Sequence, residues 1–124
     1  MIHFRIGKRS SGKSFRLMIQ LIGKEFLFIE PTLGKLKTRK YFIDNNGYCN
    51  YFGDFSKVKV STIKQYLDGA NSSVDIIVID DFNEFIQSIF RGKEVYINIS
   101  PNDNTKFINV EMESEYKLWK QKNY

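Results

Sequence analysis

The order of the predicted elements indicates an α/β protein with a mostly parallel central sheet. Short apolar runs, several of them rich in β-branched residues, alternate along the chain with segments whose apolar residues recur at helical spacing. The composition, 42% hydrophobic and 27% charged, is typical of a folded globular domain. Because 124 residues suffice for one hydrophobic core, we expect residues 1–124 to form a single domain.

The first third of the chain predicts a strand, a loop, a helix and a second strand. Apolar and polar residues alternate over 2–6, which is typical of a short strand. From 14 to 22 the apolar residues fall on helical spacing, and Gly23 stands where the C-terminal cap of a helix belongs. The continuous apolar run 26–29 predicts a buried strand of a parallel sheet.

The middle of the chain predicts a small β-hairpin insertion, an edge strand and a short helix. In residues 41–52 an Asn-Gly pair stands between two aromatic-rich flanks, which favours a hairpin. Lys and Val alternate over 57–60, as in a strand near a sheet edge with one face exposed to solvent. A short helix is expected over 62–67, ended by the Asp-Gly pair at 68–69.

The last third of the chain predicts a central strand followed by a helix and further short elements. The β-branched block 76–79 favours a central strand, and helical spacing follows over 82–90. We also expect a strand over 94–100, a last strand over 107–112 and a short helix over 114–122.

Positive charge is concentrated in the first half of the chain. The whole chain carries a net charge of +5, yet residues 1–64 hold 13 Lys and Arg against four Asp and Glu. This distribution suits the phosphates of a nucleotide or of DNA, and it equally suits a solvated basic face. Cations beside Tyr41 and Phe42 are the nucleic-acid candidates, although we expect the two rings themselves in the core. These cations are Lys35, Lys37, Arg39 and Lys40.

Several classes of protein and site lose support from the composition. No run approaches the ~18 apolar residues of a membrane helix, so we expect no membrane insertion. A strand that starts at Ile2 leaves no room for a signal peptide, and we expect a cytoplasmic protein, in the host cytoplasm if the chain is viral. The lone Cys49 and the lone His3 disfavour an internal disulfide, a structural metal site and Ser-His or Cys-His catalysis.

The stretch GKRSSGKS matches a phosphate-binding loop, because Gly7, Gly12, Lys13 and Ser14 meet the pattern G-x-x-x-x-G-K-S. It lies between a predicted strand and a predicted helix, so backbone N–H groups and the helix N-terminus can converge on phosphates. We expect Lys13 to bridge the β- and γ-phosphates of ATP and the Ser14 hydroxyl to ligate Mg²⁺. The nucleotide-binding candidates are Gly7, Lys8, Arg9, Ser10, Ser11, Gly12, Lys13 and Ser14.

Two aspartates follow the predicted central strand 76–79. In a P-loop enzyme, a carboxylate at the end of a neighbouring strand holds Mg²⁺ through water, and a second carboxylate orients the attacking water. Asp80 fits the first role and Asp81 the second. Taken alone, the pair is explained better as a solvated strand-end turn; combined with the loop, it predicts a magnesium site.

Together, GKRSSGKS and IIVIDDF resemble the Walker A and Walker B motifs of P-loop ATPases. The chain is similar to members of the additional-strand division of P-loop ATPases, because an acidic residue directly follows the metal-binding aspartate. This division contains viral DNA-packaging ATPases, DNA translocases and helicase loaders. The resemblance implies a P-loop three-layer sandwich, ATP and Mg²⁺ as ligands, and hydrolysis coupled to DNA translocation or packaging by a homo-oligomer. Most members carry glutamate where this chain has Asp81, whose side chain is shorter by one methylene.

The order of elements after the second motif is similar to that of DNA-packaging ATPases of small tailed phages. This resemblance implies that Arg91 is a finger acting on the nucleotide of a neighbouring subunit. An ordinary helix-end cation explains Arg91 equally well. The resemblance also implies a polar sensor of the γ-phosphate, and the candidates are Asn98, Ser100 and Asn102.

Other functions of the same loop stay open. A helicase loader, or a phage-assembly ATPase that acts on protein, would use the same two motifs, the latter without a DNA-dependent rate. A nucleotide-dependent switch would bind ATP with little hydrolysis, and the short side chain of Asp81 favours it.

Overall fold

The computed structural model describes three stretches of the chain, residues 1–8, 13–45 and 57–110. The chain forms two compact units: the first holds Met1–Met18 and the residues from Tyr96 on, and the second holds Ile19–Val95. All strand pairings among the described residues are parallel. The predicted α/β class is therefore confirmed in its coarse form, as parallel strands in two small sheets.

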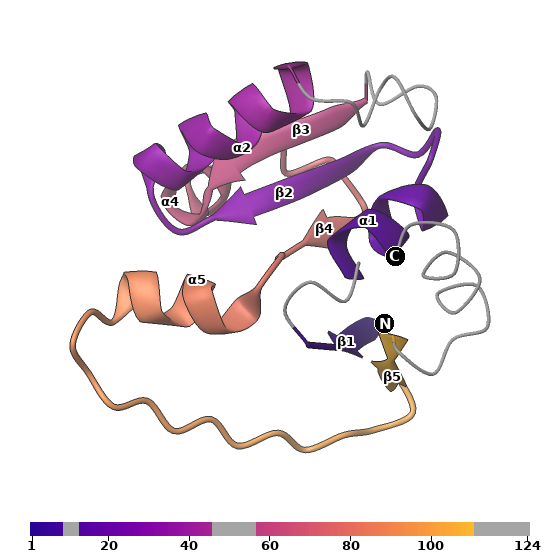
Figure 1. Cartoon of the computed structure of the whole chain (residues 1–124), viewed down its shortest axis with the longest axis vertical. Helices are drawn as coiled ribbons and strands as arrows, with labels where there is room; N and C mark the ends of the chain where they lie inside the picture. The colour runs from indigo at the N-terminus through magenta and orange to yellow at the C-terminus, as the bar shows by residue number, and fades with distance from the viewer. Residues whose placement is uncertain (9–12, 46–56, 111–124) are drawn as a thin grey trace. The chain divides into compact units, whose positions relative to one another are not determined.

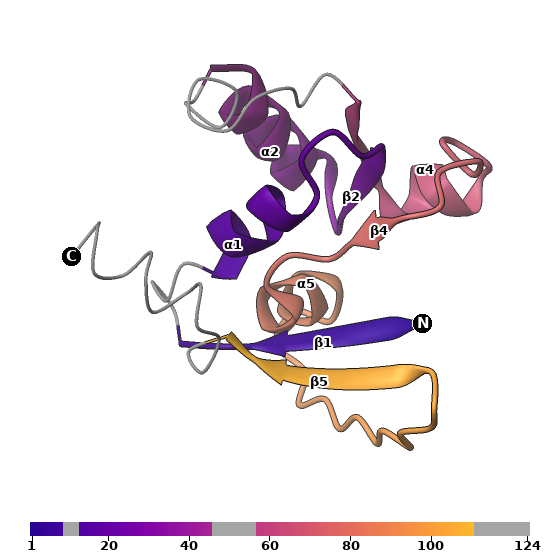
Figure 2. The same ribbon diagram turned by 90° about the vertical axis from the view of Figure 1, so that its right-hand side faces the viewer.

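The sheet of the first unit consists of β1 (Ile2–Ile6) and β5 (Thr105–Asn109). Figure 2 shows the two strands side by side. The rings of Phe4 and Phe107 face each other across the pair and stack with centroids 5.1 Å apart, which supports this register. The predicted first strand is confirmed, and the last strand begins two residues earlier than predicted.

Helix α1 (Lys13–Gln20) follows the glycine-rich loop, as the spacing of apolar residues predicts. Met18 and the nearby Leu21 are buried, whereas Ile22 is exposed, so part of the predicted apolar stripe is covered. Gly23 has φ +77°, a left-handed conformation that glycine adopts without a steric cost. The chain can therefore turn away after the helix, as expected for a helix C-terminus.

The sheet of the second unit has the order β3-β2-β4, with β2 (Phe26–Glu30) in the centre. Its neighbours are β3 (Val58–Thr62) and β4 (Ile77–Val78), both parallel to it. Every residue of β2 is buried, which explains the continuous apolar run. The predicted edge strand is confirmed as β3. The predicted strand 76–79 is confirmed as the shorter β4, but its expected central position is wrong, because among the described residues β4 lies at an edge of this sheet and β2 in its centre.

Three helices cover this sheet or follow its strands: α2 (Leu33–Asn45), α4 (Ile63–Leu67) and α5 (Phe82–Ile89). Figure 1 shows α2 lying along β2 and β3. Phe85 of α5 is buried in one cluster with Leu27, Ile29 and Val74. Each helix begins where a strand has just ended, so the βα turns gather at the carboxyl edge of the sheet.

The predicted hairpin over 41–52 is wrong in its first arm, because residues 41–45 belong to α2. Thr32 initiates this helix, since its Oγ1 accepts a hydrogen bond from the N–H of Lys35. Ile43 is buried, whereas Tyr41 and Phe42 are exposed, which also corrects the expectation that these two rings lie in the core. The second arm of the hairpin lies outside the described residues.

The predicted strand 94–100 is also wrong, because this stretch has no regular secondary structure. Its apolar residues do alternate, but Val95, Ile97 and Ile99 are all exposed. An alternating pattern forms a strand only when a neighbouring strand supplies hydrogen-bond partners. The predicted helix 114–122 lies outside the described residues. In the described ranges, no helix has the length and apolar character needed to cross a bilayer.

Candidate functional site

The carboxyl edge of the second unit's sheet brings Glu30 and Asp80 together. Strand β2 ends at Glu30, and the register pairs Leu27 with Ile77 and Phe28 with Val78. Continuing this register by two residues places Asp80 level with Glu30 on the adjacent strand path. Neighbouring parallel strands therefore deliver two carboxylates to one edge, as predicted for Asp80 but not for Glu30.

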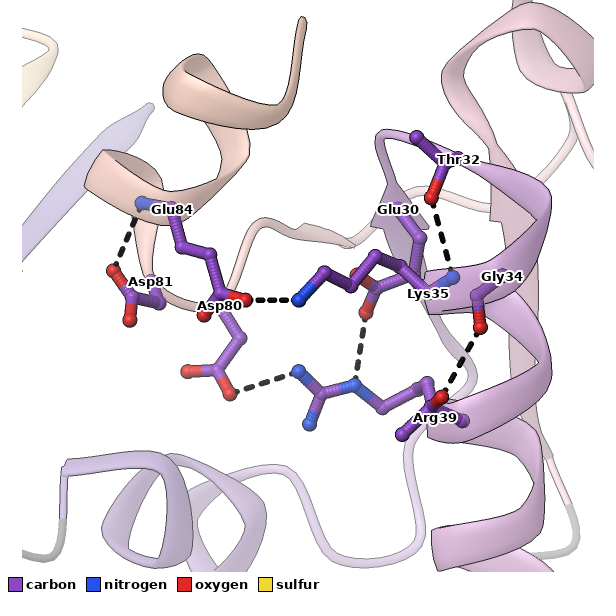
Figure 3. Close-up of polar contacts among 9 residues, drawn as sticks. Glu30, Thr32, Gly34, Lys35, Arg39, Asp80, Asp81 and Glu84 are labelled. Atoms are coloured by element: carbon purple, nitrogen blue, oxygen red, sulfur yellow. Dashed lines mark hydrogen bonds and ion pairs between the residues drawn. The ribbon is translucent and has the colours of Figure 1, made fainter. Parts of the chain in front are cut away.

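Arg39 of α2 lies between the two carboxylates and binds both (Figure 3). Its Nε donates a hydrogen bond to Glu30 Oε1 at 2.8 Å, and its Nη2 donates one to Asp80 Oδ2 at 3.1 Å. The guanidinium carbon also lies 4.6 Å from the centroid of the Phe28 ring. Only 19% of the Arg39 side chain is exposed, with 9% for Glu30 and 16% for Asp80.

The pKa values of Glu30 and Arg39 are both raised, that of Glu30 by burial and that of Arg39 by its two carboxylate partners. Burial raises the pKa of Glu30 above its ordinary value of 4.5, and the hydrogen bond and charge of Arg39, which lower it, do not cancel that effect. Burial acts to lower the pKa of Arg39, but its hydrogen bond to Glu30 and the charges of Asp80 and Glu30 outweigh it. One guanidinium is stabilised by two carboxylates, whereas each carboxylate shares its cation with the other.

Asp81 has a structural role at the start of α5. Its Oδ1 accepts a hydrogen bond from the N–H of Glu84 at 3.2 Å, which caps the helix. Its φ of 56° lies in the left-handed region, which aspartate tolerates better than most residues. The two adjacent aspartates therefore differ: Asp80 binds Arg39, and Asp81 binds the backbone of its own helix (Figure 3).

The four nucleic-acid candidates of α2 divide into two pairs. Lys35 forms an ion pair with Glu84, and Arg39 binds Glu30 and Asp80. Lys37 and Lys40 are exposed, and with Tyr41 they lie three and four residues apart, hence on one face of the helix. One face of α2 therefore serves the carboxylates, and another presents two cations and an aromatic ring to solvent.

The first unit contains the described part of the phosphate-binding motif. Strand β1 leads into Gly7 and Lys8, and Lys13 and Ser14 open helix α1. The Lys13 ammonium donates a hydrogen bond to the Lys8 carbonyl at 3.3 Å, so its side chain folds back toward the loop. The candidates Arg9, Ser10, Ser11 and Gly12 lie outside the described residues. The motif does stand between a strand and a helix, which is the context it requires.

The remaining candidates lie on turns and irregular chain. Arg91 is exposed in the turn after α5, next to Gly92 with φ +69°. Asn98 and Ser100 are exposed in the irregular stretch before β5. Asn102 closes the turn into that strand, where its Oδ1 accepts a hydrogen bond from the N–H of Asn104 at 2.8 Å. Asp80, Asp81 and Arg91 belong to the second unit, and the motif and the three sensor candidates to the first.

The donor atoms around Asp80 fit a magnesium ion that arrives with phosphate ligands. Mg²⁺ takes oxygen ligands, and proteins hold it with one or two carboxylates together with phosphates and water. Asp80 supplies a strand-end carboxylate that already accepts a cationic group, the guanidinium of Arg39. In the part of the chain that the structure describes, no group of three or more His, Cys, Asp and Glu forms a ready metal cage.

Glu30 and Arg39 are the site residues that the sequence analysis missed in these roles. The signal for Glu30 is present: it ends the apolar run 26–29 just as Asp80 ends the run 76–79. Strands of one parallel sheet share a carboxyl edge, so two acidic strand ends predict neighbouring carboxylates. The contact of Arg39 with both depends on helix α2, whose last residues replace the first arm of the predicted hairpin.

Comparison with known proteins does not assign a family. No protein-family model matches the chain, and neither a curated protein nor a solved structure is significantly similar to it. The function is therefore inferred from the residues and their arrangement.

Proposed function

We propose that the chain is a P-loop ATPase with the three-layer sandwich of that family, which binds Mg²⁺-ATP and hydrolyses its β-γ phosphoanhydride. The observation that carries the proposal is the position of the Gly7–Ser14 motif between β1 and α1. The short strand β4, of which Val78 is buried, is followed by Asp80 and Asp81, and this gives the proposal independent support. A chance match of the loop pattern alone would not predict either neighbouring element.

Each residue of the proposed site has a defined task. The backbone N–H groups of the loop and of the first turn of α1 bind phosphate oxygens, and Lys13 adds a positive charge between the β- and γ-phosphates. Ser14 and Asp80 hold the metal, the latter through water. When bound, Mg²⁺ neutralises the negative charge that develops on the phosphate oxygens. Asp81 orients the attacking water, and Arg91 serves a nucleotide on a neighbouring subunit.

The proposed partner of the ATPase is DNA, moved or packaged by a homo-oligomer. The exposed face of α2 with Lys37, Lys40 and Tyr41 supports it, since it combines phosphate-binding cations with a ring that stacks on bases. The net charge of residues 1–64 attracts the same partner. A helicase loader or phage-assembly ATPase would use the same nucleotide site with a different partner.

A nucleotide-dependent switch is the second candidate, and the hydrogen bond made by Asp81 favours it. The carboxylate that would orient water is already engaged as the cap of α5, at 3.2 Å from the N–H of Glu84. If Asp81 keeps this bond with ATP in place, no second carboxylate of the motif activates water, and bound ATP persists.

Lys13→Ala tests the proposal, with Lys64→Ala as the matched control because Lys64 is an exposed helical lysine of α4. We expect Lys13→Ala to weaken ATP binding by at least about tenfold, since it removes a charge-assisted phosphate contact. Titration with a fluorescent ATP analogue measures the affinity, and phosphate release in single turnover measures hydrolysis. Equal ATP affinity in wild type, Lys13→Ala and Lys64→Ala would reject the proposal. Tight binding without phosphate release over hours would favour the switch.

A further inference from the structure

The hydrogen bond between Arg39 and Asp80 implies a competition between two cations for one carboxylate. We propose that Arg39 is a resident counter-ion that Mg²⁺ must displace from Asp80, and that Glu30 retains Arg39 at the site when this happens. The inference rests on the proposed function and deepens it, because it concerns how the metal of that site is admitted. Arg39 and Glu30 are thus positioning residues.

The guanidinium of Arg39 divides its donors between two carboxylates. Its Nε lies 2.8 Å from Glu30 Oε1, and its Nη2 lies 3.1 Å from Asp80 Oδ2 (Figure 3). A guanidinium that faces a single carboxylate forms two parallel hydrogen bonds, which is the stronger and more specific arrangement. The bond to Asp80 is the longer of the two, so a competing cation breaks it more easily than the bond to Glu30.

Glu30 and Phe28 hold Arg39 from the direction of β2. The Glu30 side chain is only 9% exposed, and a carboxylate so buried is costly without a cation. The ring of Phe28 adds a cation–π contact at 4.6 Å. Both residues belong to the central strand, so Arg39 keeps two contacts when Asp80 is taken by the metal. Displacement therefore requires a short shift of the guanidinium and leaves α2 in place.

This competition makes the metal affinity of Asp80 depend on what accompanies the metal. Mg²⁺ and the guanidinium repel each other when both approach the same carboxylate. A metal ion without phosphate ligands binds only the carboxylate of Asp80, and nothing offsets its repulsion by the guanidinium of Arg39. A metal ion bound to a triphosphate brings negative charge that attracts Arg39 and offsets the repulsion. Asp80 therefore admits Mg²⁺ together with the nucleotide and disfavours the metal alone.

Binding of Mn²⁺, followed through the electron paramagnetic resonance signal of the free ion, tests the competition in the full chain. Arg39→Gln removes the competing cation, and we expect it to bind Mn²⁺ alone about tenfold more tightly than wild type. Asp80→Asn, added to Arg39→Gln, should abolish that gain. Glu30→Gln should weaken binding of Mn²⁺-ATP, because Arg39 then turns more fully to Asp80.

Two matched variants separate competition at Asp80 from a general change in net charge. Lys35→Gln removes a positive charge from the same helix, but this lysine pairs with Glu84. Lys59→Gln removes a positive charge from an exposed pair at the other end of the sheet. Both should bind Mn²⁺ alone within about twofold of wild type, because exposed charges are screened. Arg39→Lys keeps the positive charge but lacks the planar guanidinium that donates to both carboxylates. Its affinity for Mn²⁺ alone should therefore lie between those of Arg39→Gln and wild type.

Several outcomes would overturn the inference. No gain of Mn²⁺ binding in a folded Arg39→Gln protein, or an equal gain in Lys35→Gln, rejects competition at Asp80. If circular dichroism shows that Arg39→Gln is unfolded, the Arg39→Lys variant provides the test instead. An affinity of this variant for Mn²⁺ alone that equals that of wild type rejects the inference. Failure of the proposed function has another signature: wild type binds neither ATP nor Mn²⁺-ATP, and Lys13→Ala changes nothing. In that case, the change in affinity for Mn²⁺ alone between Arg39→Gln and wild type can still be measured.

Discussion

The two ends of strand β2 carry ion pairs of the same type in different surroundings. Beside the amino end, Glu25 and Lys59 lie 3.3 Å apart, with 45% and 44% of their side chains exposed. At the carboxyl end, Glu30 and Arg39 lie 2.8 Å apart, with 9% and 19% exposed. The difference follows from chain direction, because the βα turns of parallel strands gather at the carboxyl edge and cover it. Position in the sheet, more than residue type, decides which pair becomes part of a site.

The largest expected difference between the two ends is in stability. Arg39→Ala leaves two mostly buried carboxylates without their shared cation, and we expect it to lower the free energy of unfolding by about 3 kcal/mol. Lys59→Ala removes a cation from an exposed pair, and its cost should stay below about 1 kcal/mol. Urea unfolding followed by circular dichroism measures both. An equal loss of unfolding free energy in the two variants would contradict the contrast between the buried pair at the carboxyl end and the exposed pair at the amino end.

A smaller effect, expected at the carboxyl end, is a pH dependence that comes from Glu30. Burial raises its pKa above the 4.5 of the unfolded chain, so the fold favours its protonated form. The stability that this preference contributes is present in full below pH 4.5 and is lost as the pH rises through the raised value. Gln cannot ionise, so the stability of wild type should fall relative to Glu30→Gln as the pH rises through this window.

Thermal unfolding of wild type and Glu30→Gln at a series of pH values from just below 4.5 upward checks this sign. The opposite trend, a wild type that gains stability over Glu30→Gln with rising pH, would mean that the attraction of Arg39 outweighs burial. Glu30 would then be an ordinary ion-pair partner, and the contrast with Glu25 would lie in exposure alone.

Much of the fold could be predicted because its signals are local. The continuous run of β2, the alternation of β1 and β3, and the helical spacing of α1 and α5 each depend on a few adjacent residues. The helix α2 was missed because the Asn-Gly pair at 46–47 suggested a hairpin, while Leu36, Arg39 and Ile43 already fall on helical spacing. The stretch 94–100 shows the reverse error, since local alternation cannot supply a neighbouring strand.

The candidate site was predictable to the same extent. Lys13 opens a helix after a strand, as the first motif predicts, and Asp80 follows the short strand β4, of which Val78 is buried. The link between Glu30, Arg39 and Asp80 joins residues 9 and 41 positions apart in the chain, and no local pattern contains it. It follows only from the parallel order of β2 and β4 and from the helix that carries Arg39.

The smallest expected effect belongs to the exposed pair at the amino end. A double-mutant cycle with Glu25→Gln and Lys59→Gln should give a coupling of about 0.2–1 kcal/mol at low salt. Because the Debye length is only about 3 Å at 1 M ionic strength, this coupling should vanish in 1 M salt. The cycle with Glu30→Gln and Arg39→Gln should keep most of its coupling there, since salt screens mostly buried charges poorly. A salt-resistant Glu25–Lys59 coupling would contradict the contrast, because it would require the same exclusion of solvent at both ends of β2.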